Sequence, residues 1–257
     1  MNRAYSLRQR ILNGETVYGL FFKLNSPDVA EMAGNAGFDF IIVDTEHSNF
    51  SNYDVANIIR AADSTGMSTV VRVFAATEED VLHALDSGAD GVQIPSITSV
   101  DTAQTACAGA KYFPEGTRGL SMTQRAAMYG AWNKEESYYS QANRNSLVVV
   151  HVENKEMADA VEQLCEVPQI DVLFVGPGDL SQSIGKPGKL DDPEVVAIVE
   201  KVFKTALAKG KKVGIYCGNP AAVKKYTEMG ATYIAYGSDA TAMSSALGGI
   251  RKSLAQN

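Results

Sequence analysis

Short apolar runs alternate along the whole chain with longer segments in which polar and apolar positions are mixed. Several of the short runs are apolar almost throughout, which is typical of parallel strands that are buried on both faces. We interpret eight runs as strands, at residues 17–22, 38–43, 69–73, 91–94, 147–152, 172–175, 212–216 and 233–236. A strand–helix unit that recurs eight times favours an α/β fold with a closed (β/α)8 barrel, or TIM barrel, over a doubly wound open sheet.

The longer segments have the signals that begin and end helices. Proline directly follows Ser26, Asp192 and Asn219, and the first turn of a helix tolerates its missing N–H. A glycine ends each of these helices and allows the left-handed turn before the next strand.

One connection departs from the regular spacing. Residues 112–145, between the fourth and fifth strands, are far too long for an ordinary loop. We expect this insertion to add helical structure around Trp132 and Tyr138, and either to cover the active face or to join subunits.

The composition is that of a globular protein, with 45% hydrophobic and 21% charged residues among 257. Barrels often have this length as one unit, so residues 1–257 are predicted to form a single domain. A net charge of −7 gives no electrostatic case for nucleic acid or an anionic membrane as a partner. The sequence has no apolar stretch long enough to span a bilayer, no signal-peptide core, and three widely spaced cysteines that fit neither a disulfide framework nor a zinc motif. We expect a cytoplasmic protein.

Polar residues gather where the predicted strands end. The carboxyl ends of the strands of such a barrel meet at one mouth, which holds the active site. The residues found there are Asp44, Glu46 and His47 after the second strand, Arg72 in the third, His151 and Glu153 in the fifth, and Asp179 after the sixth. The opposite strand ends supply no comparable cluster, so the sequence predicts an active site at the mouth.

Glu153 and Asp179 are the natural metal ligands of this cluster. Two carboxylates that leave positions for water and substrate suit Mg2+ or Mn2+. Taken singly, Glu153 could cap the following helix and Asp179 could close a turn after Gly178. Their place at adjacent strand ends favours metal binding.

His47 and Arg72 are candidates for proton transfer and charge stabilisation. A lone histidine is more often structural, but an imidazole titrates near neutral pH and His47 could be a general base. The planar fork of Arg72 can hold a carboxylate or an enolate oxygen. An ion pair of Arg72 with Asp44 or Glu46 would be compatible with that role.

The turn at residues 176–179 has two glycines before a predicted helix start, where backbone N–H groups can bind a carboxylate. Phosphate is the competing ligand, but barrels usually bind it after the seventh and eighth strands. Tyr216 and Ser238 stand there with no basic residue close by, which makes phosphate the weaker interpretation. No dinucleotide or P-loop motif is present.

Several segments together indicate a family. They are Ala36-Gly37-Phe38-Asp39-Phe40, Val43-Asp44-Thr45-Glu46-His47, Val71-Arg72, Tyr112-Phe113-Pro114-Glu115-Gly116-Thr117-Arg118-Gly119, Val152-Glu153 and Gly176-Pro177-Gly178-Asp179-Leu180-Ser181. In their order and spacing they resemble the HpcH/HpaI family of class II pyruvate aldolases, nearly end to end. The resemblance implies an aldolase that cleaves a 4-hydroxy-2-oxo acid to pyruvate and an aldehyde through a metal-bound enolate. The implied metal is Mg2+ or Mn2+, with Co2+ or Zn2+ as further candidates.

The resemblance also implies a role for each residue at the mouth. Glu153 and Asp179 would hold the metal, and Arg72 would stabilise the enolate oxygen. Backbone amides at Gly178 and Asp179 would receive the substrate carboxylate, and His47 would direct proton transfer at the aldol hydroxyl. The implied substrate site comprises Arg72, Gly178, Asp179, His151 and Tyr216.

Asp86 matches an acid that in this family reaches the site of a neighbouring subunit and pairs with the histidine there. The resemblance therefore implies catalytic residues His47, Arg72 and Asp86 drawn from two subunits. It further implies a homo-oligomer, typically a hexamer built as a dimer of trimers, in which the C-terminal helix is exchanged between subunits.

Three residues depart from the pattern of the family. His151 stands where glutamine is usual, Thr45 where glycine is usual, and Phe21 where tryptophan is frequent. His151 could become a third metal ligand, hydrogen-bond a metal-bound water, or shift the metal preference toward softer ions. These changes concern the identity of the aldehyde more than the reaction class.

Three alternatives stay open at this point. Decarboxylation of oxaloacetate or cleavage of an acyl-CoA would use the same enolate, although coenzyme A calls for a basic surface that is not obvious near the mouth. A Schiff-base aldolase would need Lys23, which has no evident partner to lower its pKa. A non-catalytic binding barrel would predict a mouth without matched metal ligands and a base.

Overall fold

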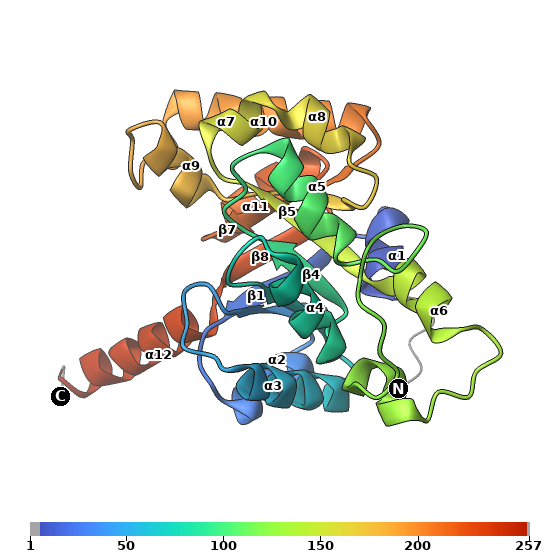
Figure 1. The fold of residues 1–257 in the computed structure, drawn as a ribbon. Helices are drawn as coiled ribbons and strands as arrows, with labels where there is room; N and C mark the ends of the chain where they lie inside the picture. Colours follow the sequence, from blue (N-terminus) through green and yellow to red (C-terminus); the bar gives the residue numbers. More distant parts are fainter. Residues whose placement is uncertain (1–5, 256–257) are drawn as a thin grey trace.

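Eight parallel strands close into a barrel in the computed structural model, which describes residues 6–255 (Figure 1). Each strand pairs with the next in sequence, and β8 pairs back with β1. The strands are β1 (Val17–Phe22), β2 (Phe40–Asp44), β3 (Ser68–Arg72), β4 (Gly91–Ile94), β5 (Leu147–Val152), β6 (Val172–Val175), β7 (Lys212–Cys217) and β8 (Tyr233–Ser238). The predicted (β/α)8 barrel is confirmed, and the β1–β8 pairing is incompatible with an open sheet.

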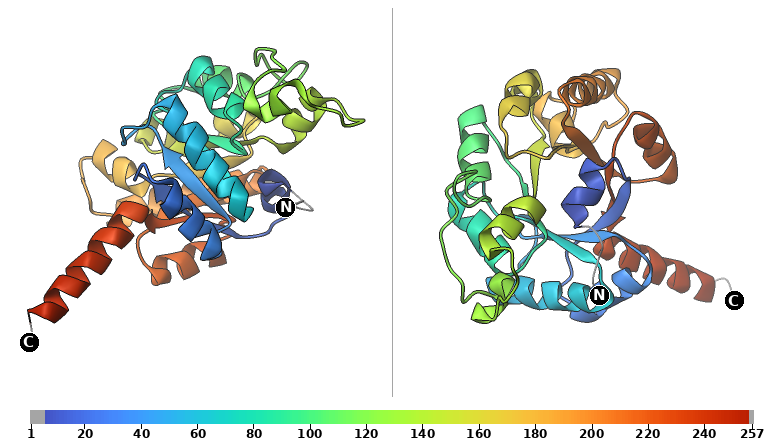
Figure 2. Two further views of the ribbon diagram at one scale, coloured as in Figure 1. Left: turned by 90° about the horizontal axis from the view of Figure 1, so that it is seen from below. Right: turned by 90° about the vertical axis from the view of Figure 1, so that its right-hand side faces the viewer.

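The barrel is accompanied by helices, most of which surround it (Figure 2). They are α1 (Leu7–Leu12), α2 (Pro27–Asn35), α3 (Asn52–Thr65), α4 (Glu78–Asp86), α5 (Val100–Ala108), the 3-10 helix η1 (Arg125–Gly130), α6 (Tyr138–Asn145), α7 (Lys155–Asp159), α8 (Val161–Glu166), α9 (Pro177–Ser183), α10 (Pro193–Ala208), α11 (Pro220–Glu228) and α12 (Asp239–Leu254). As predicted, α2, α10 and α11 begin at proline, each after a residue whose side chain caps the first turn.

The second strand begins later than the apolar run suggests, at Phe40 instead of residue 38. The carboxylate of the preceding residue, Asp39, accepts a hydrogen bond from the Tyr18 backbone N–H at 2.8 Å and pairs with Arg10 at 2.6 Å. The Asp39 backbone also bonds to Tyr18 through its N–H and to Ser68 through its carbonyl, so this residue anchors the start of the strand on both sides.

The interior of the barrel is filled by side chains. Phe40 stacks on Tyr233 with ring centroids 4.4 Å apart. Gly19 makes room for this pair, because a Cβ at that position would lie 2.4 Å from the Phe40 ring. Leu7 and Ile11 of α1 are buried in the same cluster, and so α1 closes the amino end of the barrel. The barrel is a packed core and not a pore.

The insertion before β5 lies at the amino end of the barrel and not over the active face, which corrects one of the two expectations for it. It starts at the end of α5 and leads into β5 through η1 and α6. Buried Lys111 holds it together by donating hydrogen bonds of 2.7 Å to the carbonyls of Asn143 and Ser146. Burial lowers the pKa of Lys111 to about 8. A role in joining subunits stays a prediction.

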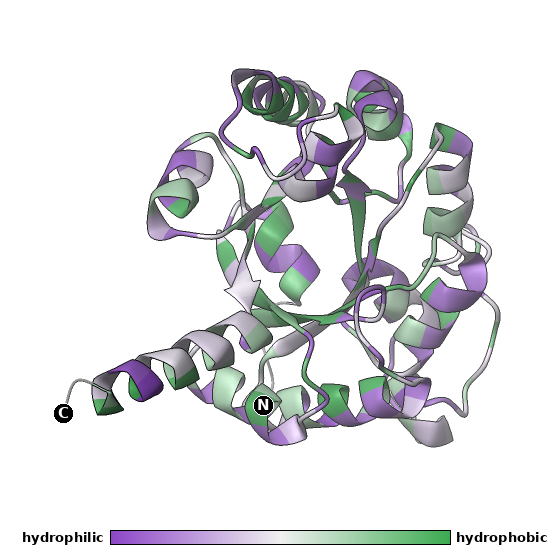
Figure 3. Ribbon diagram, turned by 90° about the vertical axis from the view of Figure 1, so that its left-hand side faces the viewer, coloured by the Kyte–Doolittle hydropathy of each residue, from purple (hydrophilic) through white to green (hydrophobic). Residues whose placement is uncertain are grey.

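Helix α12 projects away from the barrel in every view (Figures 1 and 2). Met243, Leu247, Ile250 and Leu254 recur at helical spacing along it and are all exposed. In Figure 3 the ribbon of α12 alternates between hydrophobic and more hydrophilic segments. Within residues 6–255 no helix is both long and apolar enough to cross a membrane.

Candidate active site

A cavity of about 390 Å³ opens at the carboxyl ends of the strands. Seven of the predicted site residues line it, namely His47, Arg72, His151, Glu153, Gly178, Asp179 and Tyr216. Phe21, Lys23, Phe174, Gly176, Pro177, Gly237, Ser238, Ala240 and Thr241 complete the wall. The barrel therefore brings together every predicted site residue except Asp86.

Arg72, the last residue of β3, is fixed by two carboxylates. Its Nε and Nη2 donate to the two oxygens of Asp44 at 2.9 and 2.6 Å, and Nη1 lies 2.8 Å from Oε2 of Glu46. The guanidinium carbon also lies 4.8 Å from the centroid of the Phe21 ring. Both ion pairs considered from the sequence are thus present, and they hold the charged fork at one edge of the cavity.

Asp44 is fully buried and serves two cations. Lys23 Nζ lies 2.7 Å from its Oδ2, the oxygen that also accepts from Nη2 of Arg72. Burial raises the pKa of Asp44, but the hydrogen bonds and charges of Arg72 and Lys23 outweigh it and bring the pKa to about 2. The ionised carboxylate keeps the Lys23 ammonium in an ion pair, so Lys23 has the partner that the sequence did not reveal.

Glu153 follows β5 and is buried, with one donor for each carboxylate oxygen. The Ser96 backbone N–H donates to Oε1 at 2.6 Å, and Nδ1 of His151 lies 2.6 Å from Oε2. Burial raises the pKa of Glu153, but the His151 ring, the Ser96 N–H and the nearby Arg72 charge outweigh it and lower the pKa. Ser96 adopts a φ of 55°, in the left-handed region that non-glycine residues rarely occupy. Ser96, whose N–H orients the Glu153 carboxylate, therefore has a strained backbone conformation.

The surroundings of Glu153 and Asp179 fit a divalent cation. A Cβ at Gly176 would lie 3.3 Å from Oε2 of Glu153, so glycine keeps the space beside this carboxylate open. Asp179 is exposed in the first turn of α9 and lines the same cavity. Among residues 6–255 no three His, Cys, Asp or Glu side chains form a metal-binding group. Two carboxylates with water and substrate in the remaining positions are a usual set for a hard cation.

His47 is held by its backbone while its ring stays accessible. The His47 N–H donates to Oδ1 of Asp44 at 3.2 Å. The ring is 56% exposed, and its Nε2 lies 3.8 Å from Oε2 of Glu46. The imidazole can therefore reach a molecule in the cavity.

The remaining predicted substrate contacts also line the cavity. Gly178 and Asp179 are in the first turn of α9, where backbone N–H groups have no acceptor within the helix. The Tyr216 ring lies 6.1 Å from that of Phe21, centroid to centroid, and forms an aromatic wall.

Asp86 lies at the other end of the molecule, as the last residue of α4. Its carboxylate pairs with Nη2 of Arg118 at 2.7 Å. Because α4 leads back to the amino end of the barrel, Asp86 does not contribute to the cavity of its own chain.

Three further polar residues of this region were not singled out from the sequence. Gln93 and Tyr233 lie inside apolar strands, and Ser96 follows Pro95 in a short loop. Gln93 gave a usable signal, because a polar side chain in a fully buried strand must find hydrogen-bond partners. It has two, Tyr233 and His151.

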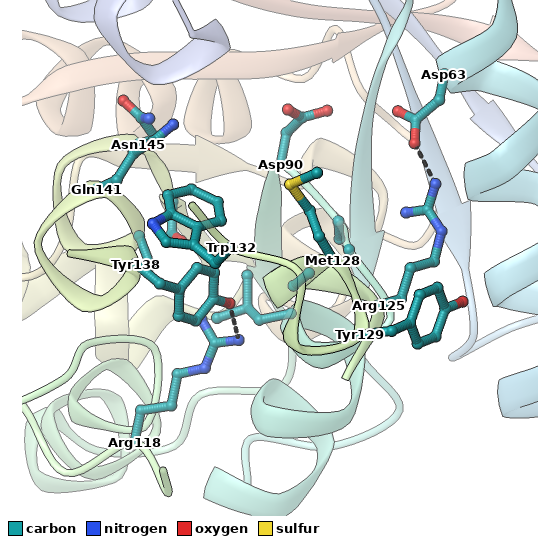
Figure 4. A pocket seen from close by; sticks show the side chains of 16 residues that line it. Asp63, Asp90, Arg118, Arg125, Met128, Tyr129, Trp132, Tyr138, Gln141 and Asn145 are labelled. Atoms are coloured by element: carbon teal, nitrogen blue, oxygen red, sulfur yellow. Dashed lines mark hydrogen bonds and ion pairs between the residues drawn. The ribbon is translucent and has the colours of Figure 1, made fainter. Parts of the chain in front are cut away.

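A second cavity, of about 460 Å³, lies between the insertion and the amino end of the barrel (Figure 4). Trp132 and Tyr138 form part of its wall, and Arg125 pairs with Asp63 across it. Arg118 at its edge lies against the hydroxyl of Tyr138. Every lining arginine thus has an acidic partner of its own.

Comparison with known proteins identifies relatives of this chain. Residues 17–246 match the model of the HpcH/HpaI aldolase/citrate lyase family. The 5-keto-4-deoxy-D-glucarate aldolase of Enterobacter sp. (strain 638) is 35% identical over 88% of this chain and 87% of its own.

Two solved structures share the whole architecture. An HpcH/HpaI aldolase/citrate lyase family protein from Burkholderia cenocepacia J2315 superposes with a TM-score of 0.89 and 33% identity, over 97% of this chain and 98% of its own. The citrate synthase SbnG superposes with a TM-score of 0.88 and 28% identity, over 98% of each chain.

Proposed function

The chain belongs to the HpcH/HpaI aldolase/citrate lyase family and is a carbon–carbon lyase, and we propose that it cleaves a 4-hydroxy-2-oxo acid to pyruvate and an aldehyde. The observation that supports this most is the pairing, in one cavity, of a fixed guanidinium with an ionised, buried carboxylate. The first can stabilise an oxyanion and the second can hold a cation, and cleavage to an enolate requires both.

Members of this family use a divalent metal. In this chain Glu153 and Asp179 would hold it, and Mg2+ or Mn2+ suits two carboxylates best, with Co2+ and Zn2+ as further candidates. Such an ion supplies Lewis-acid polarisation of the keto and carboxylate oxygens of the substrate.

Arg72 is placed to stabilise the developing enolate. Its three nitrogens are already held by Asp44 and Glu46, so the guanidinium needs no reorganisation when charge forms on the substrate oxygen. The N–H groups of Gly178 and Asp179 would receive the substrate carboxylate, and Tyr216 would pack against its carbon chain.

His47 is assigned to the aldol hydroxyl. In the cleavage direction it would accept the hydroxyl proton, directly or through a water, as the C–C bond breaks. Its ring lines the cavity and is 56% exposed, so a water or the substrate hydroxyl could reach it.

The assembly belongs to the same proposal. An oligomer, specifically a hexamer built as a dimer of trimers, would bring Asp86 of one subunit to His47 of another and cover the apolar residues of α12. Two features support it: Asp86 is at the end of the barrel opposite its own cavity, and α12 exposes an apolar stripe. We place this assembly in the cytoplasm.

A second candidate uses the same enolate in another reaction, such as oxaloacetate decarboxylation or acyl-CoA cleavage. The structural similarity to the citrate synthase SbnG supports this second candidate. The Schiff-base alternative is disfavoured, because Lys23 is engaged by Asp44 and a nucleophilic amine must be uncharged.

Pyruvate release from a panel of hydroxy-2-oxo acids, with oxaloacetate included, tests the proposal. The enzyme is stripped with a chelator and then given Mg2+, Mn2+ or Co2+. We expect activity to vanish on stripping and to return with a divalent ion. Full activity in the stripped enzyme, with borohydride trapping a covalent adduct at Lys23, would contradict the proposal, and release from oxaloacetate alone would favour the second candidate.

A further inference from the structure

We propose that His151 is a positioning residue, which orients the Glu153 carboxylate through a hydrogen-bond chain that crosses the barrel interior from Tyr233 through Gln93. The inference rests on the proposed role of Glu153 as a metal ligand. It assigns His151 a different part from the substrate contact or third metal ligand considered from the sequence.

The direction of the hydrogen bonds follows from the orientation of the Gln93 amide. The Tyr233 hydroxyl donates to Oε1 of Gln93 at 2.9 Å, which turns the amide nitrogen of Gln93 toward the histidine. That nitrogen lies 2.6 Å from Nε2 of His151. An amide nitrogen can only donate, so with this orientation of the Gln93 amide Nε2 accepts and the ring proton is on Nδ1.

The other end of the ring meets the carboxylate. Nδ1 of His151 lies 2.6 Å from Oε2 of Glu153, so the Nδ1–H group donates to that oxygen. Both ring nitrogens are then occupied, and neither has a lone pair or proton left for a metal or a substrate. Each nitrogen of the His151 ring thus makes one hydrogen bond.

The surroundings hold the ring and the carboxylate in place. The His151 side chain is 2% exposed and stacks on Phe174 with centroids 4.9 Å apart. The second carboxylate oxygen of Glu153 accepts from the Ser96 N–H. Rotation of the carboxylate would break both hydrogen bonds at once, so its outward lone pairs keep a fixed direction. Hydrogen-bond partners of this kind typically change metal affinity by about 10- to 100-fold.

Two isosteric variants separate the two ring nitrogens. The amide nitrogen of asparagine falls near Nδ1, so His151→Asn keeps a donor for Glu153 and loses the contact with Gln93. The amide of glutamine reaches toward Nε2, so His151→Gln keeps the contact with Gln93 and loses the direct bond to Glu153. The affinity of the stripped protein for Mn2+ is measured by calorimetry, without substrate. Thermal unfolding verifies that each variant is folded, and Asp179→Ala verifies that the ion binds at this site.

We expect His151→Gln to weaken Mn2+ binding on the order of 10-fold or more and His151→Asn to restore most of it. Tyr233→Phe should have a smaller effect in the same direction. Equal loss in the two His151 variants, or no loss in either, would overturn the proposal. A lack of aldolase activity in the wild type would count against the proposed function alone, because metal affinity is measured independently.

A spectroscopic measurement keeps the proposal testable if the variants do not fold. The chain has three histidines, and the exposed His47 and His83 can be assigned by substitution. Nitrogen NMR of histidine-labelled, metal-free wild type should show His151 as the neutral tautomer with the proton on Nδ1. A proton on Nε2 would refute the chain. So would electron spin-echo spectra of the Mn2+-loaded protein that show a directly coordinated histidine nitrogen.

Discussion

The two ends of the barrel each have a cavity and each pair arginines with carboxylates, yet they are built differently. At the amino end, Arg118 pairs with Asp86 and Arg125 with Asp63. Each of these pairs joins the insertion to the end of a helix. At the mouth, Arg72 binds two carboxylates at the end of a single strand, and one of these also binds Lys23.

The comparison shows that the larger cavity need not be the reactive one. The amino-end cavity measures about 460 Å³ and the mouth about 390 Å³. What distinguishes the mouth is that charged groups from several strand ends converge there, two of them ionised against the cost of burial. At the amino end each charge is satisfied locally, and such pairs serve to attach the insertion.

Arginine substitutions should separate the two ends most strongly. Arg72→Ala should lower both aldol cleavage and the exchange of pyruvate methyl protons by about 100-fold or more, because the enolate loses its fixed positive charge. Arg125→Ala is the matched control, and we expect its turnover to stay within a few-fold of wild type. Pyruvate release and proton exchange in D2O followed by NMR measure both variants. If Arg125→Ala lost as much activity as Arg72→Ala, the distinction between the two ends would fail.

His47→Ala should separate the role of His47 in cleavage from that of Arg72 in enolate formation. We expect cleavage to fall on the order of 100-fold, since the aldol hydroxyl loses its proton acceptor, while part of the methyl-proton exchange is retained. The same two assays distinguish the steps. Equal loss in both assays would mean that His47 also removes the methyl proton.

Asp86 tests whether the two ends of the barrel are functionally separate. In the proposed oligomer this amino-end residue would contribute to the active site of a neighbouring subunit. We expect Asp86→Ala to lose cleavage on the order of 10-fold, through His47 of the partner subunit. Mixing His47→Ala with Asp86→Ala subunits should then restore a fraction of the activity, since some mixed sites are complete. Full activity of a verified monomer would show instead that Asp86 belongs only to the structure of the amino end.

Lys111 should give the smallest effect, on stability and not on catalysis. Burial lowers the pKa of Lys111 to about 8 in the folded chain, whereas an exposed lysine has a pKa of 10.5. Between these two pH values the unfolded chain therefore binds more protons than the folded chain. Stability should therefore rise with pH across this window, on the order of 1–3 kcal/mol. Urea unfolding of wild type and Lys111→Met, from neutral pH to about pH 10, measures the difference. Parallel curves for the two proteins would contradict it.

The strands and their ends could be predicted because buried parallel strands have a plain apolar signature, and the barrel then decides where their polar neighbours meet. The residues that fix the active groups could not be predicted in the same way. Lys23 reaches Asp44 from another strand, and the contact of Ser96 with Glu153 depends on a backbone angle that no sequence pattern encodes. Such contacts join residues far apart in the chain.

The insertion shows the same limit. Its length marked it as an addition, but a long segment between two strands does not say on its own which surface it covers. The structure shows that α5 ends and β5 starts at the amino end of the barrel, so both ends of the insertion lie there. Residues of the insertion also line the cavity at this end, opposite the active face.

The contacts of Asp239 affect the order in which the mouth of the barrel forms during folding. Its carboxylate accepts hydrogen bonds of 2.9 Å from the backbone N–H groups of Lys23 and Leu24, more than 200 residues earlier in the chain. Contacts of such long sequence separation form slowly, and β1 can find β8 only after most of the chain has been synthesised. Until then β1 presents an unpaired apolar edge, the kind of surface on which nascent chains aggregate. We therefore expect the mouth to be the last part of the molecule to assume its final shape during biosynthesis.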